Sequence, residues 1–435
     1  MDDPLHLMII SDSPFSGTGF SEELRHILYR LVQTGLFRIS WYGLQYTGFP
    51  IYIPDSMFPD IPHTGATIKL LGTRGSASPY SLGADSNFVK HYFNENPEAV
   101  LFMGDPLTIE PYKRFKENLG FPLYMYVTLD GLPVNEKWLP LLNMVNVLIT
   151  MTEWAQEEYV KVGLAPAFIH HGLNWSWWRS PNEQIKSQLR NKYKIPEDDT
   201  VFISWDVNQH RKRMDSLLRC WSKFRPESKN AKLLLYTGWN MPQGYNLKRL
   251  IKQYKIPPET VISPEQLQEN PKYVDCAETP ERLREIAFLG DVYVSTTSGE
   301  GFGKCSLEAM GAGMPVIITD YAASSEVCAK GSILVPTYEG DAGRFRYPEY
   351  MRGVDLGIVN EEKFTEAMLE LYGDAEERRK LGFIARDWAR NFDYDKVIVP
   401  KWSSILNLVN PDEILLAELM GLGEKKVLRR VKGEE

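Results

Sequence analysis

The stretch from Asp291 to Asp320 constrains the fold of this chain more than any other segment. It runs DVYVSTTSGEGFGKCSLEAMGAGMPVIITD, with a short apolar run, a turn that holds three glycines, a helix-forming run and a second apolar run. This order predicts a buried strand over 292–294, a helix over 304–311 and a second strand over 316–318. The glycines at 299, 301 and 303 carry no Cβ atom, so the turn's backbone can approach a ligand closely.

Two glutamates in this segment indicate the kind of ligand. Glu300 precedes the predicted helix, and Glu308 lies on it eight positions later. The helix start presents free amide groups and the positive end of the helix dipole, which suit an anion. Carboxylates beside an anion site favour a ligand that is rich in hydroxyl groups, such as a nucleotide sugar.

Apolar runs and helical patterns alternate along the whole chain, which predicts parallel sheets. With 435 residues, 43% of them hydrophobic, the chain is long enough for two α/β domains with separate cores. In the first half we expect strands over 5–11, 37–44, 67–71, 100–103, 123–127, 147–150 and 167–170, and helices over 21–32, 106–118 and 152–162. The first of these helices is expected to be capped by Ser21. In the second half we expect strands over 201–205, 232–236, 261–262, 292–294, 316–318 and 333–335, and helices over 214–224, 247–254, 280–287, 304–311, 361–372 and 376–391.

A break in the pattern separates the two halves. Residues 174–181, NWSWWRSP, have no clear period and hold three tryptophans, so we expect the hinge there. The predicted domains are therefore 1–173 and 174–395, two Rossmann-like halves with a cleft between them. Residues 336–353 interrupt the second half and are expected to form an insertion or a surface loop.

Charge and cysteine content restrict the function classes. The net charge of −8 gives no general affinity for nucleic acid or anionic membranes. The four cysteines show no paired spacing and are expected to be reduced and buried: Cys220, Cys276, Cys305 and Cys328. The apolar run at 5–10 follows acidic residues and predicts a first strand, not a signal peptide, and no apolar window is long enough to span a bilayer. We therefore expect a cytoplasmic protein.

The C-terminal end is basic. It carries Lys425, Lys426, Arg429, Arg430 and Lys432. A solvated amphipathic tail is the simpler interpretation, and a weak peripheral contact with a membrane or polyanion is the alternative. The sequence does not indicate an oligomeric state.

The glutamate-containing segment resembles the EGFGxxxxEAMxxGxPVI block of the retaining glycosyltransferases of family 4. That group has the GT-B fold and is related to glycogen and sucrose synthases. The resemblance implies two Rossmann-like domains that face each other across a cleft, and a final helix within 396–435 that crosses back onto the first domain. It also implies transfer of a sugar from a nucleotide-diphosphate sugar, such as a UDP- or GDP-sugar, to a hydroxyl acceptor. The family's reaction retains the anomeric configuration and needs no metal or other cofactor.

The resemblance assigns roles within this block. Glu300 would hold hydroxyl groups of the donor sugar and is the first catalytic candidate. Glu308 would bind the ribose. The amides of the helix start would face the sugar and the diphosphate: Gly301, Phe302, Gly303 and Lys304.

A basic run follows the predicted strand at 201–205. In DVNQHRKRMDSLL, the cations lie at the carboxyl edge of the sheet, where open α/β sheets bind ligands. The run resembles the family's phosphate-binding segment, in which an Arg is followed five positions later by a Lys. Lys212 aligns with that Lys, but Val207 occupies the Arg position. Arg211 or Arg213 is expected to replace the missing charge.

The loop Ser16-Gly17-Thr18-Gly19 lies between the first predicted strand and helix. It is similar to the family's glycine loop that closes over the donor phosphates, which makes Gly17 and Gly19 candidates for donor binding. A purely structural turn is the alternative. The loop lacks the GxGxxG spacing and the later acidic residue of an NAD site, so an oxidoreductase is disfavoured.

Candidates for the acceptor side are fewer. Asp105 in LFMGDP and Asp130 in VTLDGLP both follow predicted strands. Either is a candidate to orient or deprotonate an acceptor hydroxyl, and a turn or capping role is the alternative. Asp393-Tyr394-Asp395 spells a DxD, but its place after a long helix favours capping over metal binding.

Two other functions remain open from the sequence. One is a sugar-nucleotide epimerase on the same fold, and the other is a non-catalytic protein that binds nucleotide sugars or glycans. The valine at 207 keeps the second alternative open. The acceptor is left as a glycan, a lipid-linked carrier, a protein, a small molecule or modified DNA.

Overall fold

The computed structural model describes residues 3–73, 85–267, 279–347 and 353–407. The chain divides into two compact units, and each is described by itself. The first unit comprises Met1–Thr128, Val134–Gly172 and Tyr394–Glu435, and the second comprises Leu129–Pro133 and Leu173–Asp393. The boundaries expected from the sequence fell after residues 173 and 395. The sequence did not predict that Leu129–Pro133 would group with the second unit.

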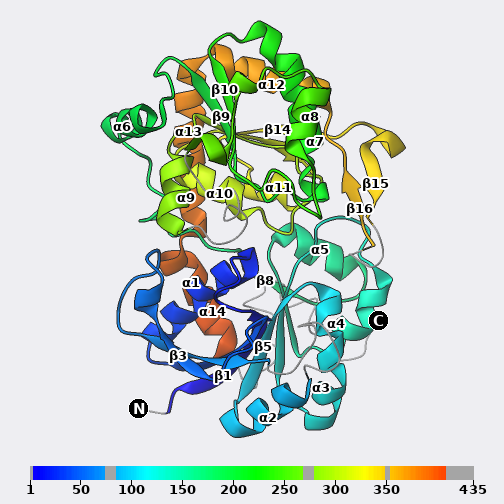
Figure 1. Cartoon of the computed structure of the whole chain (residues 1–435). Coiled ribbons are helices and arrows are strands. Elements are labelled where there is room, and N and C mark those ends of the chain that lie inside the picture. The colour runs from blue at the N-terminus through cyan, green and yellow to red at the C-terminus, as the bar shows by residue number, and fades with distance from the viewer. Residues whose placement is uncertain (1–2, 74–84, 268–278, 348–352, 408–435) are drawn as a thin grey trace. The chain divides into compact units, whose positions relative to one another are not determined.

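The first unit is built on an eight-stranded sheet (Figure 1). The strand order is β3-β4-β2-β1-β5-β6-β7-β8. Only the edge pair β3–β4 is antiparallel. The strands are β1 (Leu5–Asp12), β2 (Phe37–Leu44), β3 (Ile51–Pro54), β4 (Thr67–Gly72), β5 (Ala99–Gly104), β6 (Leu123–Val127), β7 (Val147–Thr150) and β8 (Ala167–Phe168). The continuous apolar runs of the central strands are explained by burial on both faces of the sheet.

Helices cover this sheet on both sides (Figure 1). They are α1 (Gly19–Gln33), α2 (Asp85–Glu95), α3 (Lys113–Leu119), α4 (Leu139–Leu142), α5 (Glu153–Lys161) and α14 (Val399–Leu406). Trp402 of α14 is fully buried, and its ring meets the edge of Tyr126 at 4.9 Å between centroids. The closing helix therefore packs into the core of the first unit.

The cap of α1 corrects one expectation. Thr18, and not Ser21, is the N-cap residue, and its hydroxyl accepts a hydrogen bond from the Ser21 amide at 3.2 Å. The helix starts two residues earlier than expected because Thr18 also donates to Asp12 at 2.7 Å, which fixes the loop at the end of β1.

The second unit contains a six-stranded parallel sheet in the order β11-β10-β9-β12-β13-β14. Its strands are β9 (Thr200–Ser204), β10 (Ala231–Leu235), β11 (Val261–Ile262), β12 (Val292–Ser295), β13 (Val316–Asp320) and β14 (Ser332–Pro336). Numbered within the unit, the order is 3-2-1-4-5-6, the Rossmann arrangement. The order reverses between β9 and β12, and ligands of such sheets bind outside the carboxyl ends of the strands at that point.

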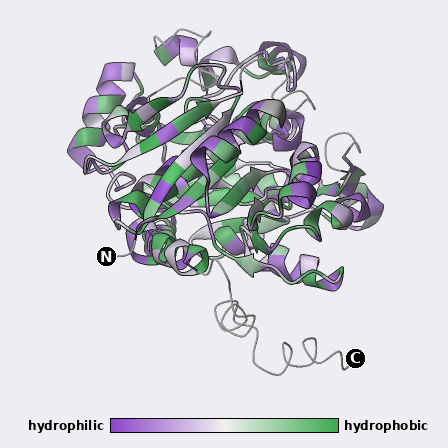
Figure 2. Ribbon diagram, turned by 90° about the horizontal axis from the view of Figure 1, so that it is seen from below, coloured by the Kyte–Doolittle hydropathy of each residue, from purple (hydrophilic) through white to green (hydrophobic). Residues whose placement is uncertain are grey.

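Eight α-helices accompany this sheet in the part of the unit that the structure describes. They are α6 (Glu183–Tyr193), α7 (Met214–Phe224), α8 (Leu247–Gln253), α9 (Pro280–Ala287), α10 (Lys304–Gly311), α11 (Ala323–Val327), α12 (Glu361–Gly373) and α13 (Ala375–Ala389). Between α7, α12 and the sheet lies an aromatic core that includes Phe202, Trp221 and Phe224. Figure 2 shows hydrophobic residues along the strands and hydrophilic residues on the outer helices.

Several elements were not expected from the sequence. These are β3, α2, α4, α6, α11 and a hairpin of β15 (Arg344–Arg346) and β16 (Asp355–Gly357). The hairpin lies partly in the expected insertion and explains why Leu129–Pro133 groups with the second unit, because Leu132 and Asp355 form a β-bridge. The strand expected at 167–170 ends at Phe168.

The chain leaves and re-enters the first unit at two places that share one anchor, Glu23 on α1. Its carboxylate accepts from the Gly172 amide at 3.0 Å and from the Tyr394 hydroxyl at 2.5 Å. His171 Nδ1 lies 3.1 Å from the same carboxylate. Glu23 is fully buried, so both crossing points are fixed to the first unit by one side chain.

Within the described ranges, no helix is long and apolar enough to cross a membrane. Cys220, Cys305 and Cys328 are free thiols, and two of them are buried. Cys305 is only partly buried, so it differs from the expectation. Cys276 and the basic tail from Lys425 lie outside the described residues.

Candidate functional site

A loop that follows β12 provides the centre of the candidate site. Residues 296–303 connect β12 to α10, and Gly303 is the N-cap residue of that helix, with φ of 96°. Gly299 packs so closely that a Cβ there would lie 2.1 Å from the carbonyl oxygen of Asp130. These two glycines are therefore required by the backbone path of the loop.

A second loop meets it from the end of β9, on the other side of the point where the strand order reverses. It leads through Trp205 and Asp206 into a short 3₁₀ turn, His210–Lys212. The Ser298 amide donates to the Arg211 carbonyl at 2.7 Å. The two loops are thus joined through their backbones.

Glu300 lies in a buried ionic cluster between these loops. Its Oε1 accepts from Lys212 Nζ at 2.5 Å and from the Thr297 hydroxyl at 2.7 Å. Its Oε2 accepts from Arg211 Nη1 at 3.0 Å, and Arg211 also donates to the Gly299 carbonyl at 2.9 Å. Glu300 is 5% exposed and Lys212 is 8% exposed. Both are held in one geometry by partners from the two loops.

Asp206 completes the cluster as a second carboxylate. It accepts from Lys212 Nζ at 2.8 Å and from the Ser295 hydroxyl at 2.5 Å. Lys212 therefore lies between Asp206 and Glu300. The cluster has two cations and two carboxylates, so it is balanced in charge.

The ionisation of the cluster follows from this geometry. Burial by itself raises the pKa of Glu300, but the charges of Lys212 and Arg211 outweigh it and lower that pKa well below its ordinary value. Burial opposes the charged form of Lys212, but Asp206 and Glu300 overcome it and raise the pKa of Lys212. Glu300 and Lys212 are therefore both charged at neutral pH.

Glu308 is held apart from this cluster by a different partner. It lies on α10, is 4% exposed, and accepts from Trp205 Nε1 at 3.0 Å. The sequence suggested that Glu300 and Glu308 face one ligand together. The structure shows that they belong to neighbouring contacts, one with the cations and one with the tryptophan that precedes Asp206.

The structure distinguishes the two arginines that were expected to replace the charge missing at Val207. Arg211 points to Glu300. Arg213 turns to Asp215, with contacts of 3.0 and 3.1 Å, while its backbone forms the N-cap of α7 with φ of 51°. Val207 itself is 45% exposed. Arg211 is therefore the cation that joins Lys212.

The remaining residues of the glycine-rich segment lie around the start of α10. Phe302 is buried and packs edge-on against Phe392 at 5.9 Å. Gly301 is buried, and Lys304 is the partly exposed first residue of the helix.

The glycine loop of the first unit is an exposed capping loop. Gly17 has φ of 67°, and Gly19 is the first residue of α1. The hydroxyls of Ser16 and Thr18 are 3.2 Å apart. In this conformation the Thr18 hydroxyl accepts from an amide at the start of α1, and both glycines are exposed.

The two acceptor-side candidates are in different units. Asp105 follows β5 in the first unit and accepts from the Thr128 hydroxyl at 3.1 Å. Asp130 groups with the second unit, where it is 3% exposed and its carbonyl oxygen faces Gly299.

The described residues contain no cluster of three or more histidine, cysteine or acidic side chains suited to a metal ion. In the Asp393-Tyr394-Asp395 segment, Asp395 forms an ion pair with Arg30 at 2.7 Å.

A family comparison finds a match within the second unit. Residues 185–343 match the family model of glycosyl transferases group 1. The matched segment contains the Glu300 cluster, Glu308 and all of α10. Comparison with curated protein sequences finds no match.

Solved structures share the fold of the whole described chain. A sucrose-phosphate synthase (tll1590) from Thermosynechococcus elongatus has a TM-score of 0.69 at 15% identity, over 93% of this chain and 98% of that one. Alr3699/HepE of Anabaena, in complex with UDP and glucose, has a TM-score of 0.67 at 13% identity, over 93% and 99%. An E. coli protein described as trehalose-6-phosphate, bound with UDP-2-fluoro glucose, has a TM-score of 0.62 at 9% identity, over 93% and 99%. This likeness confirms the GT-B fold class.

Sequence reasoning missed three residues of this candidate site. Asp206, Thr297 and Trp205 hold Lys212, Glu300 and Glu308 respectively. Asp206 and Trp205 lie at the carboxyl end of β9, which is a position that binds ligands in Rossmann-like sheets. That position was the available signal for both.

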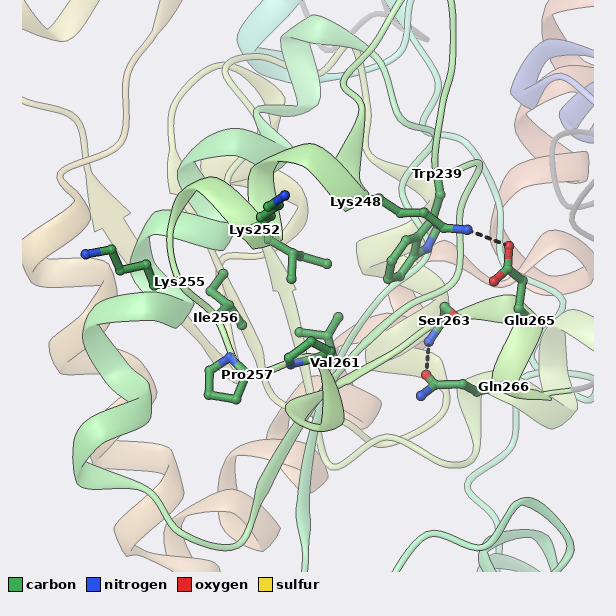
Figure 3. A pocket seen from close by; sticks show the side chains of 12 residues that line it. Trp239, Lys248, Lys252, Lys255, Ile256, Pro257, Val261, Ser263, Glu265 and Gln266 are labelled. Carbon is green, nitrogen blue, oxygen red and sulfur yellow. Dashed lines mark hydrogen bonds and ion pairs between the residues drawn. The ribbon is translucent and has the colours of Figure 1, made fainter.

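A separate cavity of about 720 Å³ lies between α8 and β11 (Figure 3). Trp239 and several aliphatic residues line it, together with Lys248, Lys252 and Lys255. Lys248 is paired with Glu265 at 2.9 Å. None of the residues predicted to bind the donor lines this cavity.

Proposed function

We propose that this chain is a glycosyltransferase that moves a sugar from a nucleotide-diphosphate sugar to a hydroxyl acceptor with retention of configuration. The observation that carries the proposal is the buried contact of Glu300 with Lys212 and Arg211. It lies where the strand order of a Rossmann-like sheet reverses, inside the segment that matches glycosyl transferases group 1.

The cations of the cluster suit the departure of a diphosphate. As the sugar–oxygen bond breaks, negative charge grows on the leaving phosphate, and preorganised positive groups stabilise that charge. Lys212 and Arg211 are fixed before the ligand arrives, because each is held by Glu300. The amides at the start of α10, from Gly303 and Lys304, add the positive end of a helix dipole.

The carboxylates suit the rest of the donor. We assign Glu300 to hydroxyl groups of the transferred sugar and Glu308 to the ribose. A carboxylate that stays charged at neutral pH is a strong acceptor for hydroxyl groups. Gly301 and Phe302 would contribute main-chain amides, and Gly17 and Gly19 of the first unit remain predictions for the donor phosphates.

The acceptor is the less defined substrate. Asp130 and Asp105 remain the candidates to orient its hydroxyl group. In a retaining reaction without a carboxylate nucleophile, the leaving phosphate takes the acceptor proton on the same face of the sugar. The structures with UDP or a UDP-sugar support a nucleotide donor with a uracil base as the first test. Glycans, lipid-linked carriers, proteins and small molecules are the proposed acceptors.

We further propose that the reaction needs no metal, because Lys212 and Arg211 supply positive charge at the leaving group. Activity that persists in EDTA would support this, and activity restored only by a divalent cation would contradict it. The free thiols of Cys220, Cys305 and Cys328 fit a reducing compartment, which supports the cytoplasm as the site of action.

The test of the proposed function is a panel of UDP-, GDP- and ADP-sugars, with release of nucleotide diphosphate as the readout. We expect slow hydrolysis of one donor without an acceptor and faster turnover with the correct acceptor. Glu300→Gln should abolish both while nucleotide binding remains. Glu366→Gln is the matched control, because Glu366 is an exposed glutamate of α12. Binding without turnover across the panel would favour a non-catalytic binding protein, and isomerised donor as product would favour an epimerase.

A further inference from the structure

The second unit has a further cavity, which is polar and lies at the end of the sheet where its strands begin. Its volume is about 420 Å³, and it is lined by α6, by the start of α13 and by the turns that lead into β12 and β13. The Glu300 cluster follows the carboxyl ends of the strands, whereas this cavity precedes their amino ends. The two ends of a five-residue strand lie roughly 16 Å apart. The cavity is therefore distinct from the site of the proposed function.

Four cationic side chains line this cavity. Lys186 and Arg190 come from α6, and Arg378 and Arg379 come from α13. Asp291 pairs with the first two and offsets one of their two charges, since its carboxylate lies 2.6 Å from Lys186 Nζ and 2.6 Å from Arg190 Nη2. Its second oxygen also accepts from the Val201 amide at 2.7 Å.

Arg190 is a fixed part of the wall. It is 4% exposed, and its Nη1 donates to the carbonyls of Glu197 and Asp199. Its Nε is buried and has no hydrogen-bond partner. A buried guanidinium group with an unsatisfied N–H is costly unless an acceptor reaches it.

The two arginines of α13 have no carboxylate partner among the described residues. Arg378 Nη1 donates to the carbonyls of Leu371 and Tyr372 at the end of α12. Burial lowers the pKa of Arg378, the carboxylates of Asp291 and Asp374 oppose this, and the charges of Arg379 and Arg190 act in the same direction as burial. The acids Glu183 and Glu197 also line the cavity, and Glu197 accepts from the Ser187 hydroxyl at 2.7 Å. The lining therefore holds four cations against three acids, a formal excess of one positive charge, and Arg379 is its exposed cation.

We propose that this cavity binds a small phosphoryl dianion, either inorganic phosphate or the phosphate group of a small ester. Arg378 and Arg379 would contact the phosphoryl oxygens, and Arg190 would stand behind them as a buried charge. Guanidinium groups match phosphate in geometry and stay charged at all relevant pH values. The volume is within the range of small-ligand sites.

The test uses inorganic phosphate and glucose 6-phosphate at constant ionic strength, with melting temperature and titration calorimetry as readouts. A ligand that binds only the folded state raises the melting temperature. We expect a rise with at least one of the two ligands. A larger rise with glucose 6-phosphate identifies an ester site, and an equal rise identifies a site for the phosphoryl group alone. Arg379→Gln should weaken binding about tenfold, the value of one charged hydrogen bond.

Three control variants locate the effect. Lys380→Gln removes the same charge from the next residue of α13, whose side chain is exposed and paired with Glu377. Lys252→Gln changes the cavity of Figure 3. Arg211→Gln changes the donor site. All three should keep the response of the unmodified chain. The proposal is overturned if the unmodified chain does not respond, if Arg379→Gln and Lys380→Gln behave alike, or if Arg211→Gln or Lys252→Gln removes the response.

Discussion

At the scale of single residues, the structure distinguishes the two arginines that the sequence offered as replacements for a charge missing at Val207. The guanidinium group of Arg211, four residues after Val207, reaches Glu300 at 3.0 Å. Arg213, two residues later, is held by Asp215 through two contacts. The sequence offered both Arg211 and Arg213 as replacements, and only their side-chain contacts distinguish between them.

This difference predicts a contrast between two arginine variants. Arg211→Gln should lower kcat/KM for the donor by roughly a hundredfold, since the loss of one preorganised group at the leaving oxygen costs about that much. Arg213→Gln should change kcat/KM by less than about fivefold, because the Arg213 side chain contacts Asp215 and not Glu300. Steady-state kinetics with a saturating acceptor measures both. Equal losses in the two variants would contradict the assignment of Arg211.

Glu300 also predicts a pH dependence of stability. The lowered pKa means that Glu300 stabilises the folded chain fully above its unfolded pKa of about 4.3 and loses this effect as pH falls through the folded pKa, which is about 2. At pH 7, Glu300→Gln should lower the free energy of unfolding by about 3 kcal/mol, because Lys212 and Arg211 lose a buried partner.

Urea denaturation of both proteins across pH 3 to 8 measures this effect. The difference between them should be constant above about pH 5 and shrink below it. A difference that grows towards acid pH would show that the carboxyl group is not held in its charged form.

At the scale of elements, the loop between β12 and α10 depends on a glycine that touches another segment. A methyl group at Gly299 would meet the Asp130 carbonyl at 2.1 Å. Gly299→Ala should therefore lower the free energy of unfolding by about 1–3 kcal/mol, as backbone displacement requires.

Gly373→Ala is the matched control for this variant. No atom lies within 4 Å of a Cβ at the end of α12, so this change should be neutral or stabilise by up to about 1 kcal/mol. Thermal or chemical denaturation compares the two variants. A neutral Gly299→Ala would show that the loop can move away from Asp130.

The elements also show what the sequence could reveal. The strands β2, β6, β7 and β11 and the helices α7, α9 and α10 have the predicted bounds, because continuous apolar runs or clear helical periods mark them. The sequence of the helix α6 shows neither an apolar run nor a clear helical period. Only Arg190 among its residues is buried, and ion pairs with Asp291 hold it in place. Pairings between residues a hundred positions apart leave no local pattern.

The same reason limits what could be predicted of the site. Glu300 and Lys212 were identified because each lies in a motif with a recognisable spacing. The contact of Glu308 with Trp205 depends on how β9 and β12 pair, and the contact of Lys212 with Asp206 depends on the path of the loop after β9. Neither partner belongs to a motif, so their roles follow only from the three-dimensional arrangement.

At the scale of the whole molecule, one side chain fixes both places where the chain leaves and re-enters the first unit. Glu23→Gln keeps the size of the side chain but replaces an acceptor oxygen with a donor group. It therefore cannot accept from both Gly172 and Tyr394. We expect a loss of about 1–3 kcal/mol in the free energy of unfolding.

Tyr394→Phe should reproduce part of this loss, since it removes only the hydroxyl. Glu157→Gln, at an exposed position of α5, is the control and should be neutral. Chemical denaturation followed by near-UV circular dichroism measures all three. If Glu23→Gln matches Glu157→Gln, the anchor contributes nothing to stability.

The balanced charges around Glu300 have a further consequence for affinity. In the free chain, Lys212 and Arg211 already hold an anion, and that anion is Glu300 itself. Under the proposed function, an incoming diphosphate would share Lys212 and Arg211 with Glu300, and the dissociation constant would report a smaller electrostatic gain than two unpaired cations give. Donor and product should therefore bind with modest strength and weak dependence on ionic strength, which would favour release of the spent nucleotide.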